Sequence, residues 1–407
     1  MATSDTSEYD RLEKVRIGLI DHANLQIDCD RSTAYELVEF FSFFVPGYKY
    51  MPAFRNRMWD GKIRMFDQNG KLPAGLYQHL LHFCNTNQYD VDIYDTKYGN
   101  PSNVEELNFD ELVNFIKQLE LPFPLRDYQF EAVVNGLKKK RAILVSPTGS
   151  GKSLIIYILM RYWLQMLTTG GKYPKAGRVL IVVPTTSLVE QMYNDFINYG
   201  HDEKAMHRIY SGRDKVGDCS IYISTWQSIY KLPKAWFSQF GMVVGDECHG
   251  FKSKSLMSIM NKCSEAPYRF GTTGTLDGAL THELVLQGLF GKVMKVTTTK
   301  SLQDNDTLAK LEITRLILDY DKDIKQNFGN KKYHEEIDYI VTHEKRNNLI
   351  ANLTIKQKGN SLVLFQFVEK HGEPLFKLIR EKAEENRKVF YVSGNIDTAD
   401  REAIRKI

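Results

Sequence analysis

Residues 142–153 have the sequence AILVSPTGSGKS, in which a short apolar run leads into a glycine-rich turn. The run predicts a buried parallel strand, and the apolar residues 154–160 that follow the turn predict a buried helix. A strand, a glycine-rich turn and a helix in this order form a phosphate-binding loop. The backbone N–H groups of residues 148–152 and the helix N-terminus can all point at phosphate oxygens.

Side chains of this loop have the types that a nucleoside triphosphate requires. Lys152 is expected to neutralise phosphate charge and Ser153 to hold Mg²⁺, so ATP and Mg²⁺ are the expected cofactors. Ser146 stands where the usual pattern has glycine, while the GSGKS core is intact. A chance glycine turn is the alternative, and the flanking strand and helix disfavour it. The expected nucleotide-binding residues here are Thr148, Gly149, Ser150, Gly151, Lys152 and Ser153.

An acidic motif, Asp246-Glu247-Cys248-His249, follows the apolar run at residues 242–245. Ligands bind at the carboxyl ends of the strands in an open α/β sheet, so these carboxylates are expected beside the phosphate loop. Asp246 is then placed to bind Mg²⁺ through water, and Glu247 to orient and deprotonate the attacking water. The alternative is a solvated acidic pair, which the upstream loop disfavours. The expected catalytic residues are Lys152, Asp246, Glu247 and His249.

Composition places the chain among globular proteins. Its 407 residues are 43% hydrophobic and 26% charged, which suits two or three domains with ordinary cores. No apolar run approaches the length of a membrane span, and residues 1–10 are polar and acidic, unlike a signal peptide, so a cytoplasmic location is expected. The five cysteines are scattered without CxxC spacing, which indicates neither a zinc site nor a disulfide framework.

The pattern along the chain predicts three domains. Residues 1–117 are expected to form a small α+β domain, with a strand at 25–27, a helix at 32–43 begun by Ser32 or Thr33, a hairpin at 59–67 and a helix at 75–84. Residues 118–300 alternate strand-like and helical patterns, which predicts a parallel sheet covered by helices. Residues 301–407 are expected to hold a linker and the first strands, 361–365 and 388–392, of a second sheet.

Basic and aromatic residues alternate between Lys49 and Lys71. Six basic residues face two acidic ones there, and this local excess of +4 equals the net charge of the whole chain. Such alternation suits phosphate contacts combined with base stacking, so Arg55, Arg57, Lys62 and Arg64 are expected to bind nucleic acid. A cationic hairpin with a buried aromatic face has the same pattern, and both interpretations stay open.

Four further motifs surround the phosphate loop and the acidic motif. They are Leu125-Arg126-Asp127-Tyr128-Gln129, Pro184-Thr185-Thr186, Thr225-Trp226-Gln227 and Thr273-Gly274-Thr275. In order and spacing they resemble the Q motif and motifs Ia, Ib and III of superfamily-two DExH helicases. The resemblance implies RecA-like motor domains in which Arg126 and Gln129 hold the adenine. It also implies that residues 184–186 and 225–227 contact nucleic acid, and that residues 273–275 couple the nucleotide to the second motor domain.

Three stretches narrow the resemblance further. Residues 59–64, 72–76 and 236–241 are similar to those of the UvsW type of T-even bacteriophage helicase, and the similarity runs from about residue 24 onward. It implies a motor that regresses forks, migrates Holliday junctions and dissociates D-loops and R-loops. The expected partners are branched or duplex DNA and RNA–DNA hybrids, with no membrane and with a monomer favoured. The expected location becomes the cytoplasm of the host cell.

The family pattern departs from this sequence near residue 407. Motifs V and VI should follow residues 391–395, so the second motor domain is expected to be incomplete and ATP hydrolysis to be poor. Two alternative functions remain open at this stage. One is an ATP-gated nucleic-acid binding or annealing protein, and the other is the translocase subunit of a restriction system.

Overall fold

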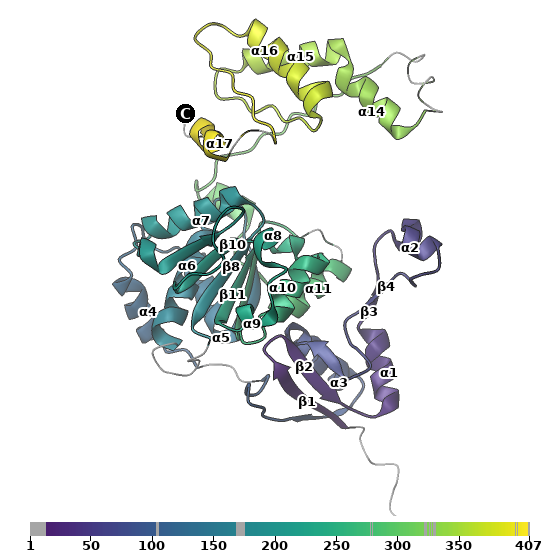
Figure 1. Ribbon diagram of the computed structural model, residues 1–407, viewed down its shortest axis with the longest axis vertical. Helices are drawn as coiled ribbons and strands as arrows, with labels where there is room; N and C mark the ends of the chain where they lie inside the picture. Colours follow the sequence, from purple (N-terminus) through teal and green to yellow (C-terminus); the bar gives the residue numbers. More distant parts are fainter. Residues whose placement is uncertain are drawn as a thin grey trace, which may run out of the picture. The chain divides into compact units, whose positions relative to one another are not determined.

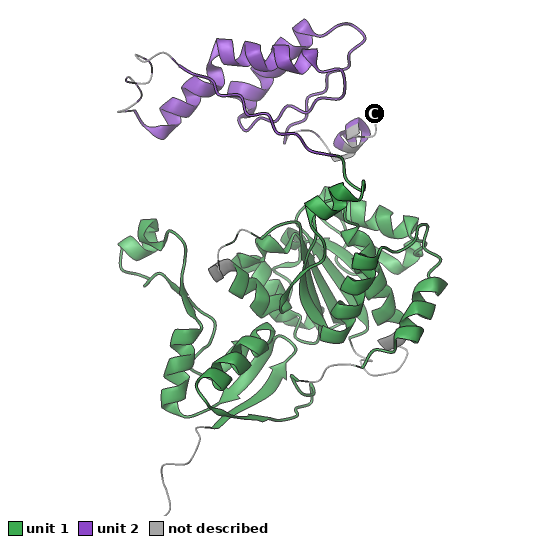
Figure 2. Ribbon diagram, turned by 180° about the vertical axis from the view of Figure 1, so that it is seen from behind, with its two compact units in different colours: residues 1–309 green, residues 310–407 purple. Residues whose placement is uncertain are grey.

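The computed structural model describes residues 14–102, 106–167, 176–276, 278, 280–320, 324, 326, 328, 331–394, 396 and 398–405. Residues 1–10 and Asn395, on which two of the expectations above rest, lie outside these ranges. The chain divides into two compact units, residues 1–309 and residues 310–407 (Figure 2). Within the described ranges, no helix is both long enough and apolar enough to cross a membrane.

A seven-stranded parallel sheet forms the centre of the first unit (Figure 1). Its order is β13-β7-β12-β11-β8-β10-β9. The apolar runs at 142–145 and 242–245 become the strands β7 and β11, as predicted. The strands are β7 (Arg141–Val145), β8 (Arg178–Val183), β9 (Met206–Ile209), β10 (Ile221–Thr225), β11 (Phe240–Asp246), β12 (Tyr268–Thr273) and β13 (Val293–Lys295).

Helices cover both faces of this sheet because its strands are apolar on both sides. Ala142 and Leu144 of β7 face one core with α4 (Phe109–Gln118), α5 (Asp127–Lys139), α6 (Lys152–Tyr162) and α7 (Thr186–Asn198). Ile143, between them, faces the opposite core with α8 (Trp226–Ile229), α9 (Lys234–Phe237), α10 (Lys254–Lys262) and α11 (Leu280–Phe290). The predicted α/β fold is confirmed.

A four-stranded sheet of order β5-β2-β1-β6 lies in the N-terminal part of the same unit. Its strands are β1 (Lys14–Asp21), β2 (Asn24–Asp28), β5 (Lys71–Pro73) and β6 (Asp90–Ile93). Its core also holds Leu37 of α1 (Arg31–Phe40) and Leu80 of α3 (Tyr77–Thr86). Asp30 begins α1, since its carboxylate accepts from the backbone N–H groups of Ser32 and Thr33, so the predicted helix start at those two residues is wrong.

Residues 42–64 form an arm that extends from this sheet (Figure 1). Its stalk is the antiparallel pair β3 (Ser42–Phe44) and β4 (Lys62–Arg64), and its tip holds α2 (Pro52–Arg55). The predicted hairpin at 59–67 is wrong, because β4 pairs with β3 and the chain turns again only after it. That later turn is held by the Asp67 carboxylate, which accepts from the N–H groups of Asn69 and Lys71.

The N-terminal sheet is joined to the larger one through α11 and the amino ends of β7 and β12. His79 Nε2 lies 2.7 Å from Gln287 Oε1, and Arg141 Nη2 donates to the carbonyl of His22 at 2.8 Å. Burial, followed by the charges of Arg141 and Arg269, lowers the pKa of His22 to about 3, so His22 is neutral in this junction. A Cβ on Gly75 would lie 1.9 Å from the Gln287 carbonyl oxygen, so only glycine permits this approach.

The second unit is a small helical cluster in the residues that the structure describes. Ala351 of α15 (Glu344–Lys356) packs against Leu375 and Ile379 of α16 (Glu373–Lys382), while α14 (Tyr333–Thr342) precedes them and α17 (Thr398–Arg405) follows. Segments 361–365 and 388–392 approach each other, since the rings of Phe365 and Tyr391 stack at 5.3 Å. Neither segment is a strand, so that prediction is wrong. A single pair of strands is marginal without further neighbours.

Gly75→Ala tests the close packing of the N-terminal sheet on α11. The added methyl group meets backbone rather than a flexible side chain, so the unfolding free energy of the first unit should fall by about 1–3 kcal/mol. Thermal unfolding should record a lower melting temperature, by roughly 2–4 °C for each kcal/mol. Gly359→Ala is the matched control because no atom lies within 4 Å of its Cβ position. A Gly75→Ala protein as stable as this control would contradict the close approach.

Candidate nucleotide-binding site

Five neighbouring strands of the large sheet end at the motifs that the sequence singles out. The order β7, β12, β11, β8, β10 places the phosphate loop, residues 273–275, the acidic motif, residues 184–186 and residues 225–227 next to one another. The register sets this alignment, since Thr273 pairs with Val145 and Asp246 pairs with Thr272. Residues far apart in the chain therefore meet at the carboxyl edge of one sheet, where open α/β folds bind ligands.

The phosphate loop has the backbone that its glycines require. Gly149 and Gly151 have φ values of 82° and 81°, in the left-handed region that favours glycine. Ser146 Oγ donates to Ser150 Oγ at 2.6 Å, and Ser150 Oγ donates to the Pro147 carbonyl at 2.7 Å. These two buried hydroxyls hold the loop across its base. The serine at position 146, which departs from the usual glycine, thus has a structural partner.

Lys152 turns back onto the loop that carries it. Its Nζ donates to the carbonyls of Ser146 at 3.1 Å and Pro147 at 3.4 Å. Burial raises the pKa of Tyr199 to about 12, and the nearby Ser153 hydroxyl opposes this shift. The side chain that the sequence assigns to phosphate, Lys152, therefore has protein partners in this structure.

The residues of the Q motif contact the phosphate loop directly. Gln129 Nε2 and Tyr128 Oη each donate to the Ser150 carbonyl at 2.9 Å. Gln129 Oε1 accepts from the backbone N–H of Arg126 at 3.0 Å, so each end of its amide has one partner, and the residue is 4% exposed. The Arg126 side chain is exposed. The arrangement fixes Gln129 against the loop and leaves Arg126 at the surface.

The two carboxylates of the acidic motif, Asp246 and Glu247, differ in burial and in backbone conformation. Asp246 ends β11 and is 8% exposed, and its Oδ1 accepts from Thr272 Oγ1 at 2.6 Å. Glu247 is half-buried with φ 49° and ψ 49°, a left-handed conformation that is costly for a residue with a Cβ. Burial, with the charges of Asp246 and Glu247, raises the pKa of the Cys248 thiol, so a buried, uncharged side chain directly follows the pair.

His249 connects the acidic motif to the end of β12. Its Nδ1 lies 3.1 Å from Thr273 Oγ1 and 3.3 Å from Glu247 Oε2. Thr273 Oγ1 in turn donates to the carbonyl of Thr275 at 2.9 Å. A chain of short contacts thus runs from the acidic pair to the segment that includes Gly274.

The two outer motifs hold polar groups at the same edge of the sheet. Thr185 is exposed and begins α7, with its hydroxyl accepting from the N–H of Leu188 at 3.4 Å. Gln227 Nε2 donates to the Pro184 carbonyl at 3.3 Å, which joins the two motifs. Thr225 is 5% exposed and its hydroxyl lies 3.0 Å from Ser228 Oγ. Among these residues, Thr185, Thr186, Trp226 and Gln227 remain more accessible than Thr225.

The basic residues of the arm divide into two pairs. Lys62 Nζ lies 3.0 Å from Glu39 Oε2, and Arg64 forms an ion pair with Asp60. Arg55 and Arg57 are exposed at the tip. The sequence predicts nucleic-acid binding for all four residues. In the structure, Arg55 and Arg57 are the two of the four without an ion-pair partner among the described residues, and they are exposed to an outside partner.

Three residues beside the site are absent from the set that the sequence predicts. Thr272 donates a hydrogen bond to Asp246, and Tyr128 donates one to the phosphate loop. Leu308 packs against Gly149, since its Cδ2 lies 2.7 Å from the position that a Cβ on Gly149 would take. Tyr128 lies within the Q motif, and Thr272 directly precedes residues 273–275. Leu308 has no signal in the sequence, since it reaches the loop only through the turn after α12 (Thr299–Asp304).

Two family models match separate parts of the chain. The model described as DNA helicase UvsW, N-terminal matches residues 14–94, which hold the four-stranded sheet and the arm. The model described as type III restriction enzyme, res subunit matches residues 122–278, which hold the phosphate loop and the acidic motif.

Curated relatives cover the same regions. The ATP-dependent DNA helicase uvsW of Enterobacteria phage T4 is 36% identical over 407 aligned positions, which span 97% of this chain and 78% of the relative. The DNA 3′-5′ translocase XPB2 of Sulfurisphaera tokodaii is 33% identical over 162 residues, which span 38% of this chain and 33% of that protein.

Two solved structures, both of the phage T4 helicase UvsW, resemble this one. The first has a TM-score of 0.61 at 36% identity and covers 69% of this chain and 99% of that chain. The second has a TM-score of 0.61 at 34% identity and covers 97% of this chain and 77% of that chain. The similarity thus extends over the N-terminal sheet, the large sheet and most of the second unit.

Thr272→Val tests the support of the buried Asp246 carboxylate. Valine keeps the shape of threonine but cannot donate, so Asp246 loses a hydrogen bond in a buried place and the unfolding free energy should fall by about 1–3 kcal/mol. Thr272→Ser retains the hydroxyl and is the control. Denaturant unfolding of the two variants measures the difference. Equal stability of both would show that the hydroxyl does not support the carboxylate.

Proposed function

The chain belongs to the UvsW family of ATP-dependent DNA helicases, and from this premise we propose that it acts on branched DNA. The proposed reactions are fork regression, branch migration of Holliday junctions and dissociation of D-loops and R-loops, with RNA–DNA hybrids as a second class of substrate. The observation that carries the proposal is the convergence of the phosphate loop, the acidic motif and three further motifs at one edge of the large sheet.

The nucleotide is ATP, in keeping with the family, and the residues at this edge suit it. Triphosphate binding would require Lys152 to exchange the Ser146 and Pro147 carbonyls for phosphate oxygens. The helix dipole of α6 and the N–H groups of the loop favour the same charge. Arg126, exposed beside the loop, is proposed to contact the base together with the fixed Gln129.

Oxygen atoms at the site fit Mg²⁺, a hard cation that prefers carboxylate and hydroxyl ligands. Asp246 has one carboxylate oxygen engaged by Thr272, which orients the other, and Ser153 lies in the first turn of α6. Bound there, Mg²⁺ would neutralise charge on the phosphates. Glu247, held near His249, is proposed to orient the attacking water and accept its proton.

The outer motifs are proposed to hold the backbone of one DNA strand. Residues 184–186 and 225–227 offer hydroxyl, amide and backbone groups, which suit phosphate and sugar and carry no sequence information. Residues 273–275, linked to Glu247 through His249, are proposed to couple the nucleotide to the second motor domain. Arg55 and Arg57 at the arm tip would add phosphate contacts outside the motor.

A strand-displacement assay on a forked DNA tests the proposed function. Strand separation should require hydrolysable ATP and should be absent with a non-hydrolysable analogue. An ATP-gated annealing protein would bind the fork with either nucleotide and separate no strands. A restriction translocase would act on unbranched duplex as well as on forks, so a comparison of the two substrates distinguishes it.

Lys152→Ala and Glu247→Gln should separate nucleotide binding from hydrolysis. Loss of the lysine charge should weaken ATP binding and reduce turnover by on the order of 10²-fold or more. Glu247→Gln keeps the shape of the side chain and removes the base, so ATP should still bind while hydrolysis falls. Titration with a fluorescent ATP analogue and a phosphate-release assay measure the two effects. Equal loss of nucleotide affinity in both variants would contradict this division of roles.

Arg55→Ala/Arg57→Ala should weaken binding to forked DNA without changing nucleotide affinity. The slope of log affinity against log salt should become shallower by about 0.9 for each phosphate that the variant no longer neutralises. Lys71→Ala removes an exposed charge of the same domain outside the arm and is the control. An unchanged slope in the double variant would favour the alternative in which the arm charges only solvate its surface.

A further inference from the structure

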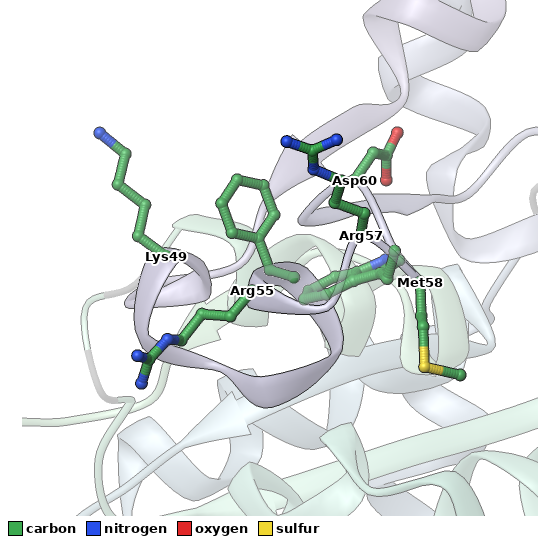
Figure 3. Close-up of a pocket in the computed structure, with 7 residues that line it drawn as sticks. Lys49, Arg55, Arg57, Met58 and Asp60 are labelled. Carbon is green, nitrogen blue, oxygen red and sulfur yellow. The ribbon is translucent and has the colours of Figure 1, made fainter.

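The tip of the arm bears an open, solvent-facing pocket of about 620 Å³. Its volume lies within the range of small-molecule sites, about 300–1,000 Å³. Figure 3 shows Lys49 and Arg55 extending on one side of the tip and Met58 on the other. The lining residues are Lys49, Phe54, Arg55, Arg57, Met58, Trp59 and Asp60.

The pocket is built on an ordered scaffold. Phe44 and Tyr48 stack at 4.7 Å, and Phe54 packs edge-on against Tyr48 at 4.8 Å. Trp59 Nε1 donates to the Lys62 carbonyl at 2.9 Å, and Met58 N–H donates to the Ala53 carbonyl at 2.9 Å. These contacts fix the aromatic side chains before any partner arrives, which lowers the entropy cost of binding.

The chemistry of the lining combines apolar surface with positive charge. Phe54, Trp59 and Met58 supply aromatic and thioether groups, and Met58 is 81% exposed. The one carboxylate of the lining, Asp60, is ion-paired with Arg64 and accepts from the N–H of Lys62 at 3.1 Å. Its charge is therefore compensated, and the lining presents the excess of Lys49, Arg55 and Arg57 to a ligand.

One residue of the pocket lining, Arg57, has a strained backbone conformation. Arg57 has a φ of 57°, in the left-handed region that an arginine adopts only at a cost. The conformation projects its guanidinium from the tip near Asp60 (Figure 3). Strained residues of this kind concentrate at binding sites, where the fold holds a side chain in the orientation that a ligand needs.

We propose that this pocket takes an unstacked nucleobase at the branch point of DNA, with Lys49, Arg55 and Arg57 on the flanking phosphates. The inference rests on the proposed action on branched DNA and specifies what the arm recognises. Phosphate contacts alone need no apolar cavity. A base inside a duplex has both faces covered by its neighbours, so only an unpaired base can offer its face to Phe54 or Trp59.

The test compares two DNAs of equal length and equal phosphate number, using the full chain without nucleotide. One is a duplex with three central mismatches and 2-aminopurine at the middle one, and the other is the same duplex fully paired. Phe54→Leu keeps apolar volume against Tyr48 and removes the aromatic face. The preference for mismatched over paired DNA should fall roughly tenfold in this variant, since one stacked base contributes that much.

Three further variants make the result specific. Phe54→Tyr keeps the aromatic face and should restore the preference. Phe109→Leu removes another exposed phenyl group, 47% exposed on α4, and should leave it unchanged. Met58→Ala changes an exposed side chain of the pocket lining and removes no buried contact. It is the alternative variant if Phe54→Leu does not fold. It should reverse part of the 2-aminopurine quenching that the wild-type chain produces.

The outcomes separate this inference from the proposed function. The proposed base-binding role of the pocket would be overturned by either of two results. One is a folded Phe54→Leu protein whose preference for mismatched over paired DNA is unchanged, and the other is a 2-aminopurine signal that binding does not alter. If Arg55→Ala/Arg57→Ala weakens both DNAs equally while Phe54→Leu has no effect, the arm is a phosphate-binding surface only. If neither variant changes binding while the fork is still unwound, the motor function stands and the arm has no part in DNA binding.

Discussion

The position of β12 between β7 and β11 is the constraint on which the site depends. This strand pairs with the phosphate-loop strand on one side and the acidic-motif strand on the other, so its register sets the distance between the two. A slip of one residue would turn Thr272 away from Asp246, because side chains alternate between the faces of a strand. Arg269 anchors the start of β12. Its fully buried guanidinium donates to the carbonyls of Met260, Cys263 and Leu289, which joins the strand to both α10 and α11.

The two ends of the same sheet have separate tasks. The amino ends of β7 and β12 carry Arg141 and Arg269, and the N-terminal sheet docks there through His22. Burial lowers the pKa of Arg141 to about 9, and a neutral His22 avoids adding a third positive charge beside the two arginines. The carboxyl ends carry the motifs that are proposed to bind the nucleotide and nucleic acid. The N-terminal domain is therefore attached at the opposite end of the strands, and its arm extends from its own sheet.

The sequence predicts what local patterns determine and misses what depends on distant contacts. Apolar runs identify β7, β8, β10 and β11, and the motifs at their ends identify most of the site. The short hairpin expected in the arm is wrong because the partner of β4 is β3, and the aromatic contacts among Phe44, Tyr48 and Phe54 hold the loop between them. The ion pair of Lys62 is equally invisible in the sequence, since Glu39 lies on another element, whereas Asp60, the partner of Arg64, lies only four residues away. Leu308 reaches the phosphate loop only through the tertiary fold.

The lysine of the phosphate loop already has hydrogen-bond partners within its own loop. Lys152 donates to the carbonyls of Ser146 and Pro147, and Leu308 lies against Gly149. On the proposed function, Lys152 would exchange these carbonyls for phosphate oxygens, so part of the binding free energy would be used to reorganise the loop. Leu308 belongs to the last residues of the first unit, directly before the second unit begins at residue 310. The phosphate loop is therefore in contact with the segment that leads to the second unit, and this contact comes from the tertiary fold rather than from any motif in the sequence.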